Sequence, residues 1–164
     1  MADLFFELLQ LLLNTEVHLL DQIQANGAAA IRVAIDEAFK SAGNWTEKKS
    51  GGIDWSKQMR YNSTLIAKIG VEVHVSARSD LLVRDVVHLR NSLQLAEIDV
   101  GVIVVPDDRM QKLLPDRTPC FSDAVRYIEK DFPEAMNYPI IVVAVEQDGP
   151  SGKPLPKRRK SDSP

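Results

Sequence analysis

The amino-acid chain begins with two stretches in which apolar residues recur at helical spacing. From residue 3 to about residue 24 a broad apolar face predicts a long first helix. The residues that form this face are Leu4, Leu8, Leu11, Leu12, Val17, Leu19 and Leu20. Asn26-Gly27 is expected to end that helix, and a second helix is expected from Ala28 to Ala42, closed by Gly43-Asn44.

The pattern then changes to that of strands. Ile69 to Ser76 alternates apolar and polar side chains, which is typical of a strand with two different faces. Ile98 to Val105 and Ile140 to Val145 are nearly continuous apolar runs, and such runs favour strands that are covered on both faces. Between them, helices are expected from Ser79 to Leu95 and from about Phe121 to Asp131.

This order of elements predicts an α/β fold with a central mixed β-sheet flanked by helices on both faces. We expect a single domain over residues 1–148. Residues 149–164 are rich in Gly, Pro, Lys and Arg and have no apolar pattern, so they are expected to form a mobile basic tail. Its run Lys157-Arg-Arg-Lys160 can contact phosphates without sequence preference, or act as an import signal.

Composition agrees with one soluble core. The chain has 164 residues, of which 45% are hydrophobic and 26% charged. Its single cysteine, Cys120, excludes a disulfide framework and makes a reducing cytoplasm the natural compartment. The leucine-rich start follows Asp3, is interrupted by Glu7 and Gln10, and is too short to span a bilayer, so no membrane partner is expected.

Charge is distributed unevenly between the tail and the rest of the chain. Residues 151–164 carry five basic and one acidic side chain, a net charge of +4, so the other residues carry 15 basic and 22 acidic side chains, a net charge of −7. An acidic body argues mildly against a DNA partner, because phosphate binding uses basic surface. A metal bound by several of the carboxylates would remove part of that objection.

The candidate chemistry lies around the strand from Ile69 to Ser76. Alternation along this strand points Glu72, His74 and Ser76 to one face. Asp54 can supply a second carboxylate if the intervening chain folds back antiparallel. Two acidic oxygens on neighbouring strands are what Mg²⁺ needs, because this ion prefers oxygen ligands and keeps waters for chemistry on a phosphate.

Four stretches of the chain carry a family resemblance. They are Gly70-Val-Glu-Val-His74, Glu97-Ile-Asp-Val-Gly-Val-Ile-Val-Val-Pro106, Asp116-Arg-Thr-Pro-Cys-Phe-Ser122 and Pro139-Ile-Ile-Val-Val-Ala-Val-Glu146. In this order they resemble the BglII/BstYI-type restriction endonucleases over about residues 52 to 148. Those enzymes have the PD-(D/E)XK fold, with Glu-x-Gln in place of Glu-x-Lys. This chain has His74 at the third position, and its gap between Asp54 and Glu72 is longer than usual for the family.

The resemblance implies a metal-dependent deoxyribonuclease that hydrolyses double-stranded DNA, with a two-fold dimer acting on a palindromic site. It assigns one or two Mg²⁺ ions to Asp54, Glu72 and the backbone carbonyl of Val73. It makes His74 the third catalytic residue, as a neutral acceptor that positions the attacking water, as a cation beside the phosphate, or as a metal ligand.

Further side chains around this centre are candidates for secondary roles. Glu37, on the second helix, could act as an accessory carboxylate, although an ordinary surface glutamate explains it as well. Basic residues near the site would be expected to contact phosphates. The candidates are Lys48, Lys49, Lys57, Arg60, Arg78, Arg84 and Arg90. On the predicted helix from Ser79 to Leu95, Asp85 and His88 are expected on an exposed flank.

Two other classes of function stay open at this stage. The fold could persist as a non-catalytic DNA-binding or assembly module in which His74 marks lost chemistry. Such a module would bind DNA but fail to cleave it with Mg²⁺ or Mn²⁺. Alternatively, the chain could be a plain interaction protein that associates through its leucine-rich first helix, in which case no metal-linked behaviour is expected.

Overall fold

The computed structural model of the chain describes residues 1–47 and 52–157. Its helices are α1 (Ala2–Leu13), α2 (Ala28–Ala42), α3 (Ser79–Gln94) and α4 (Phe121–Arg126), and α4 continues into one π turn, Tyr127–Asp131. Short 3-10 turns cover Asp108–Leu113 and Pro133–Asn137. The strands are β1 (His18–Leu19), β2 (Thr46–Glu47), β3 (Trp55–Tyr61), β4 (Thr64–Val73), β5 (Val100–Pro106), β6 (Ile140–Val145) and β7 (Gly149–Pro150).

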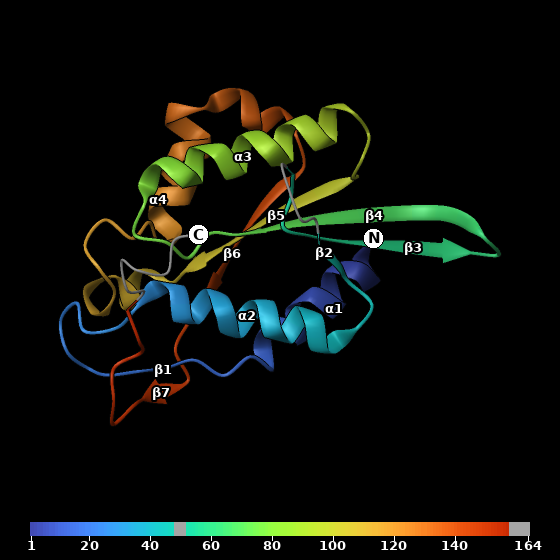
Figure 1. The fold of residues 1–164 in the computed structure, drawn as a ribbon. Coiled ribbons are helices and arrows are strands. Elements are labelled where there is room, and N and C mark those ends of the chain that lie inside the picture. Colours follow the sequence, from blue (N-terminus) through green and yellow to red (C-terminus); the bar gives the residue numbers. More distant parts are fainter. Residues whose placement is uncertain (48–51, 158–164) are drawn as a thin grey trace, which may run out of the picture.

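One mixed sheet forms the centre of the fold, in the order β2-β3-β4-β5-β6. The pairs β2/β3 and β3/β4 are antiparallel, whereas β4/β5 and β5/β6 are parallel. Helices α1 and α2 cover one face of this sheet, and α3 and α4 cover the other (Figure 1). The predicted α/β class with helices on both faces is therefore confirmed.

Alternation along β4 and β5 builds a core on each face of the sheet. Val71 on β4 and Val102 on β5 pack with α1 and α2 in the first core. Ile103, on the opposite face of β5, packs with Val86 and Leu89 of α3 in the second. Burial on both faces explains why β5 has no polar side chain, whereas β4 carries polar residues in its more exposed first half as well as at its buried end.

The first helix is shorter than predicted. It ends at Leu13, where Thr15 donates its hydroxyl hydrogen bond to the carbonyl of Leu11 at 2.8 Å. From Val17 to Leu19 the side chains alternate between buried and exposed, because this segment leads into β1 and does not continue the helix. The spacing of the apolar residues in this segment fits a helix as well as a strand. Pairing with a strand from the far end of the chain makes the segment a strand.

That partner strand also changes the expected end of the packed domain. Gly149–Pro150, predicted to begin the tail, form β7 and pair in parallel with β1. Further on, the N–H of Gly27 donates to the carbonyl of Leu155 at 3.0 Å. The packed part of the chain therefore extends beyond residue 148, and most of the basic run from Lys157 to Lys160 lies outside the described residues.

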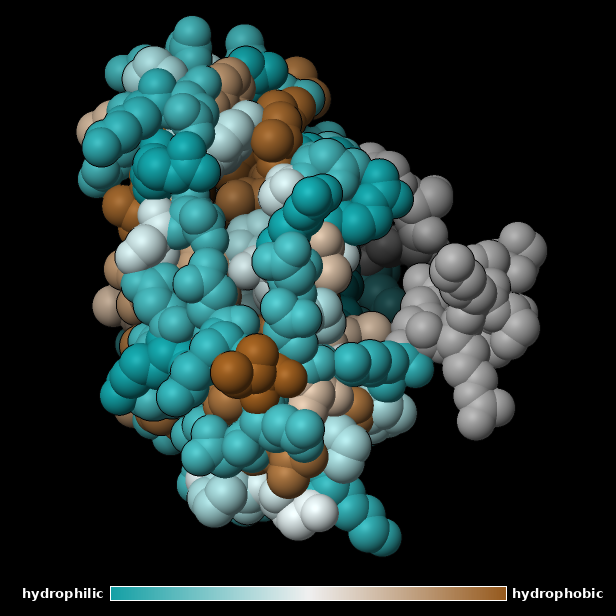
Figure 2. Space-filling view, turned by 90° about the vertical axis from the view of Figure 1, so that its left-hand side faces the viewer, coloured by the Kyte–Doolittle hydropathy of each residue, from teal (hydrophilic) through white to brown (hydrophobic). Residues whose placement is uncertain are grey.

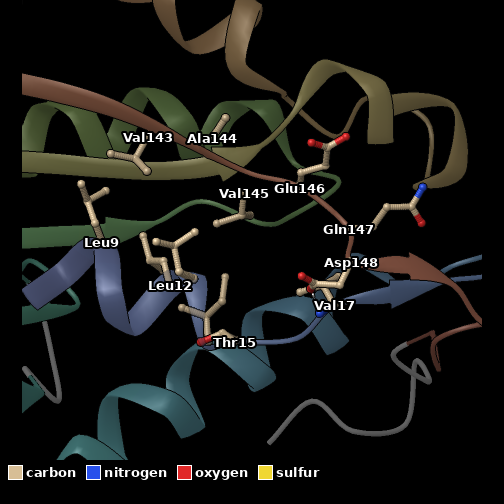
Figure 3. A pocket seen from close by; sticks show the side chains of 12 residues that line it. Leu9, Leu12, Thr15, Val17, Val143, Ala144, Val145, Glu146, Gln147 and Asp148 are labelled. Atoms are coloured by element: carbon tan, nitrogen blue, oxygen red, sulfur yellow. Dashed lines mark hydrogen bonds between the residues drawn. The ribbon is translucent and has the colours of Figure 1, made fainter. Parts of the chain in front are cut away.

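A cavity of about 300 Å³ lies between the end of α1 and the carboxyl end of β6 (Figure 3). Leu9, Leu12 and Val143 make much of its lining apolar. Its acidic residues are already engaged, since Asp148 accepts from the N–H of Val17 at 2.7 Å and Glu146 pairs with Arg109. This cavity therefore holds no free cluster of polar groups suited to chemistry.

None of the helices in residues 1–47 and 52–157 combines the length and the apolar character that a bilayer crossing requires.

The packing of α2 on the sheet depends on aromatic contacts. The ring of Phe39 stacks on Trp55 with centroids 4.9 Å apart and meets the edge of Trp45 at 5.0 Å. Because Phe39 is fully buried, it fixes the position of α2 over β3.

We predict that Phe39→Ala lowers the free energy of unfolding by about 3–5 kcal/mol, because it removes a buried ring and leaves a cavity between α2 and the sheet. Urea unfolding followed by tryptophan fluorescence measures the change. Phe6→Ala is the matched control, since Phe6 is 61% exposed on α1 and should cost less than about 1 kcal/mol. Equal losses for the two variants would contradict this account of the packing.

Candidate metal centre

The two predicted carboxylates meet where the β3/β4 ladder ends. The ladder ends with the pair of Trp55, the first residue of β3, and Val71 of β4. Asp54 takes over there with its side chain, since its Oδ2 accepts from the N–H of Val73 at 2.8 Å. Glu72 lies beside it and forms a hydrogen bond with the Asp54 carboxylate. The antiparallel fold-back expected from the sequence therefore brings Asp54 and Glu72 together.

Burial makes Glu72 an unusual carboxyl group. It is 1% exposed. Burial, followed by the nearby charges of Asp54 and Asp85 and the hydrogen bond to Asp54, raises the pKa of Glu72 to about 10. Without a bound metal ion, Glu72 therefore retains its proton at neutral pH.

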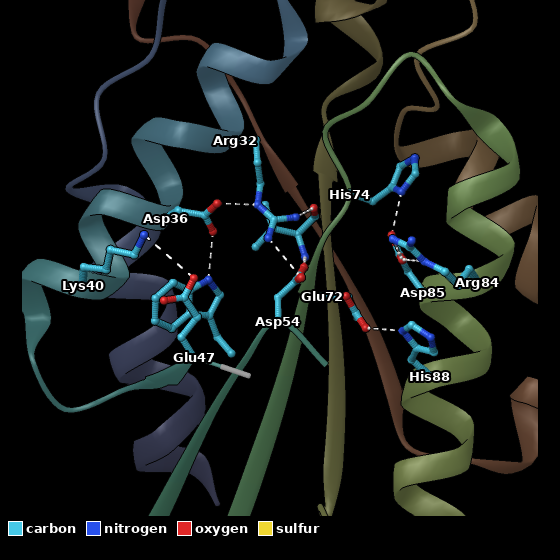
Figure 4. A network of polar contacts seen from close by, with 12 residues as sticks. Arg32, Asp36, Lys40, Glu47, Asp54, Glu72, His74, Arg84, Asp85 and His88 are labelled. Carbon is cyan, nitrogen blue, oxygen red and sulfur yellow. Dashed lines mark hydrogen bonds and ion pairs between the residues drawn. The ribbon is translucent and has the colours of Figure 1, made fainter. Parts of the chain in front are cut away.

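A cation from α2 already lies against Asp54. The guanidinium of Arg32 places Nη2 at 3.0 Å from Asp54 Oδ1, and its Nη1 donates to the carbonyl of Val73 at 2.6 Å (Figure 4). Burial lowers the pKa of Arg32, but the charges of Asp54 and Asp36 outweigh it and hold that pKa above its ordinary value. Arg32 is thus a permanent positive charge at two of the three predicted metal ligands.

Asp36 fixes the direction of the Arg32 side chain. Its Oδ2 accepts from Arg32 Nε at 2.7 Å, one helical turn away on α2. Its other oxygen accepts from the indole Nε1 of Trp55 at 2.9 Å. Asp36 therefore joins the helix to the start of β3. Glu37, the carboxylate expected from the sequence to assist the site, is exposed.

Helix α3 brings a second set of polar groups to the other side of Glu72. His88 Nδ1 lies 3.1 Å from Glu72 Oε1, and His74 Nδ1 lies 2.8 Å from Asp85 Oδ2 (Figure 4). Asp85 was expected on an exposed flank but is 4% exposed. Arg84 compensates part of its charge, with Nη2 at 3.1 Å from Asp85 Oδ1.

Glu72, Asp85 and His88 each bring one ligand atom within 4.8 Å of the others. Two carboxylates and one imidazole can hold a divalent ion, and the imidazole makes this set better suited to a transition metal than to Mg²⁺. The set around Asp54, Glu72 and the Val73 carbonyl consists of oxygens alone, so it suits Mg²⁺. Glu72 belongs to both groups, so both donor sets fit the hypothesis of a divalent metal.

His74 follows β4 and lies on the same side as Glu72, as its spacing suggests. It is 2% exposed, and its contact is with Asp85 rather than with Asp54. Its Nε2 is buried and has no hydrogen-bond partner among the described residues. The structure therefore brings Asp54, Glu72 and Val73 together and places His74 one step away, across Asp85.

The basic residues predicted to contact phosphates differ in their surroundings. Lys57 forms an ion pair with Glu7 of α1, and Arg60 donates to the carbonyl of Ser63 at 3.0 Å in the hairpin between β3 and β4. Arg78 is exposed just before α3 and pairs with Asp80. The other candidates are Arg84 and Arg90, which bond to Asp85 and Asn91, and Lys48 and Lys49, which lie outside the described residues.

The parallel strands run toward one side of the molecule, where α2 and α3 also begin (Figure 1). Seen from that side, the surface is mostly hydrophilic with small apolar patches (Figure 2). Two helix N-termini at one edge of the sheet favour negatively charged ligands, because each carries a partial positive charge.

Sequence reasoning missed Arg32, Asp36 and the buried position of Asp85. A signal was present for the first two, since Arg32 and Asp36 are four residues apart on the predicted second helix and carry opposite charges. Asp85 and His88 are three residues apart on α3 and could likewise have been paired. Nothing in the spacing, however, indicated which residue of β4 each pair would meet.

The raised pKa of Glu72 predicts a pH dependence of stability. In metal-free protein the folded state retains a proton that the unfolded chain loses near pH 4.5, so stability should decline as the pH rises from about 5 to 9. Glu72→Gln removes this decline. The free energy of unfolding of the variant, relative to that of the parent, should therefore rise by about 2–4 kcal/mol between pH 5 and pH 8. Urea unfolding in a chelator at both pH values measures it. Parallel pH profiles for parent and variant would exclude a buried, proton-retaining Glu72.

Comparison with known proteins supplies the last observation. The family model for the restriction endonuclease BglII/BglIII matches residues 1–145, and a search of curated proteins finds no match. The matched span includes the sheet, α1 to α4 and every residue of the centre described above. It covers more of the chain than the predicted resemblance did, and it confirms that resemblance. The chain belongs to the restriction endonuclease BglII/BglIII family, a family of site-specific deoxyribonucleases.

Proposed function

We propose that the protein is a Mg²⁺-dependent, type II-like restriction endonuclease that hydrolyses phosphodiester bonds of double-stranded DNA at a palindromic site. The observation that carries this proposal is the convergence of Asp54, Glu72 and the Val73 carbonyl at the end of β4. These oxygens belong to two adjacent strands, and family membership makes DNA the substrate.

Each residue of the centre has a proposed part in the reaction. Asp54, Glu72 and the carbonyl of Val73 would hold the ion, which when bound acidifies a water and neutralises charge on the phosphate. Hydrolysis of the phosphodiester would consume one water, whose oxygen ends on phosphorus and one of whose protons ends on the leaving sugar oxygen. Glu72 would lose its own proton as the ion binds, because a ligand carboxylate must be ionised.

His74 keeps a proposed role as the third residue of the plan. Its Nδ1 lies 2.8 Å from Asp85 Oδ2, and this contact fixes the orientation of the ring. Through Asp85, it is linked to the group that contains Glu72 and His88. We therefore assign His74 to positioning the α3 side of the centre, where an incoming water can be held near Glu72.

A second candidate function follows from the same contact. Because His74 is buried against Asp85, the chain can be a catalytically impaired member that binds DNA without cutting it. The two functions differ in one observable, which is the cleavage of plasmid DNA with Mg²⁺ or Mn²⁺. Binding without cleavage at any concentration of either ion would select the impaired member.

A homodimer is proposed as the working unit in the cytoplasm. Each protomer of a symmetric pair would cut one strand of a symmetric duplex. Exposed apolar side chains support association through α1 and α2, since Phe6, Leu13 and Val33 are 61%, 72% and 53% exposed.

The proposed cytoplasmic location agrees with the state of Cys120. Its thiol is free and buried, and burial is the main cause that raises its pKa to about 12. Such a thiol is compatible with a reducing compartment.

We predict that Glu72→Ala and Asp54→Asn each abolish metal-dependent cleavage, with a loss of at least about 10³-fold, because each removes a ligand of the ion. Plasmid cleavage with Mg²⁺ and mapping of the DNA ends measure the activity and its site. Glu16→Ala is the control, because Glu16 is an exposed glutamate that lies beside His18 of β1, at 3.6 Å, and is not among the proposed ligands. If Glu72→Ala cleaves as fast as the parent, Glu72 is not part of the site.

We also predict a dimer at micromolar concentration, and sedimentation velocity with and without DNA measures it. Phe6→Ser together with Leu13→Ser should shift the protein toward the monomer, because both changes remove exposed apolar surface from α1. A parent protein that remains monomeric under both conditions would count heavily against paired cutting.

A further inference from the structure

We infer that Arg32 is the mobile cation of this nuclease centre: it occupies Asp54 and the Val73 carbonyl when no divalent ion is bound, and it turns to the scissile phosphate when the ion displaces it. This inference rests on the proposed function. It assigns to α2 the positive charge that the Asp…Glu-x-Lys plan places two residues after the glutamate, where this chain has His74.

The contacts of Arg32 coincide with the ligands of the proposed ion. Its two terminal nitrogens lie 3.0 Å from Asp54 Oδ1 and 2.6 Å from the carbonyl oxygen of Val73. A divalent ion bound to these oxygens cannot share them with the guanidinium, because the two positive charges would then meet within a few ångströms. Binding of the ion therefore requires that the guanidinium leave.

Exposure of the side chain allows that movement. The planar guanidinium moves as one unit, so turning it away from Asp54 also releases its Nε from Asp36, which accepts from it at 2.7 Å in the ion-free protein. The side chain is 30% exposed, in contrast to the fully enclosed Glu72. The guanidinium can therefore turn outward to the edge of the sheet where α2 and α3 begin, which is the side from which a phosphate would approach.

The chemistry of arginine suits a phosphate better than it suits the alternative role of a base. A guanidinium stays charged throughout the ordinary pH range, so Arg32 does not accept a proton from water. Its planar fork matches two oxygens of one phosphate. His74 cannot supply this charge to the centre from its buried position against Asp85.

A purely structural role for Arg32 makes a different prediction. If Arg32 only ties α2 to β4, its removal should weaken the metal site, because the ligands would lose their support. If Arg32 occupies the ligands, its removal should instead strengthen binding of a divalent ion in the absence of DNA. The direction of this change separates the two roles without any measurement of activity.

The test uses Arg32→Met, which keeps the apolar stem and removes the charge, and Arg32→Lys, which keeps the charge and removes the fork. Calorimetric titration with Ca²⁺ in the absence of DNA should give Arg32→Met an affinity about tenfold above that of the parent, the effect of losing one competing contact. In chelator its melting temperature should fall below that of the parent, because Asp54 loses its partner, and Ca²⁺ should restore it.

Cleavage with Mg²⁺ supplies the second readout. Arg32→Met should cleave about 10²–10³-fold more slowly than the parent, the loss typical for one group that stabilises transition-state charge. Arg32→Lys should retain more cleavage than Arg32→Met. Arg126→Gln is the matched control, because Arg126 is an exposed arginine bonded to Asp131 at 2.9 Å, and it should match the parent in both measurements.

The inference is overturned if Arg32→Met binds Ca²⁺ no more tightly than the parent, or if it cleaves as fast. Failure of the proposed function gives a different result, in which the folded parent itself neither binds Ca²⁺ nor cleaves DNA with Mg²⁺ or Mn²⁺. That result removes the centre and the role of Arg32 together. A parent that binds and cleaves, beside an Arg32→Met that behaves like Arg126→Gln, removes only the role of Arg32.

Discussion

The balance of charge at the carboxyl end of β4 governs how this part of the molecule is built. Asp54, Glu72 and Asp85 converge where the sheet meets two helices, and Glu72 and Asp85 are almost completely buried. Ionised carboxylates in such a place are costly unless positive charges reach them. Both α2 and α3 therefore contribute cationic or imidazole side chains, and their positions over the sheet are tied to this one cluster.

The same balance separates the two faces of the sheet by chemistry. On the α2 side, Arg32 meets Asp54 directly, with Asp36 joining helix to strand. On the α3 side, His74 and His88 meet Asp85 and Glu72. A fixed positive charge thus lies on one side of Glu72, and groups that can also bind a transition metal lie on the other. Apolar cores on both faces hold the helices that carry these groups.

Much of the fold could be predicted from the sequence, because period and local signals agree in α2, α3 and β6. The prediction was wrong at the first helix, where Val17 and Leu19 fit a helical stripe but alternate along β1. Pairing between β1 and β7 joins residues some 130 positions apart, and no local pattern encodes it. For the same reason the pair Asp54 and Glu72 could be predicted from neighbouring strands, whereas Arg32 and Asp85 could not.

The surroundings of the third residue, His74, decide what it can contribute to the centre. A side chain two residues after Glu72 points toward α3. A cation at that position would therefore be drawn to Asp85, which competes with a phosphate for it. His74 is held in that way, at 2.8 Å from Asp85. A charge that comes from α2 already reaches Asp54, since Arg32 Nη2 lies 3.0 Å from Asp54 Oδ1 while Asp36 accepts from its Nε. Its backbone lies on a helix that the stacking of Phe39 on Trp55 holds against the sheet. Geometry therefore makes α2 the better source of positive charge for a phosphate at this edge of the sheet.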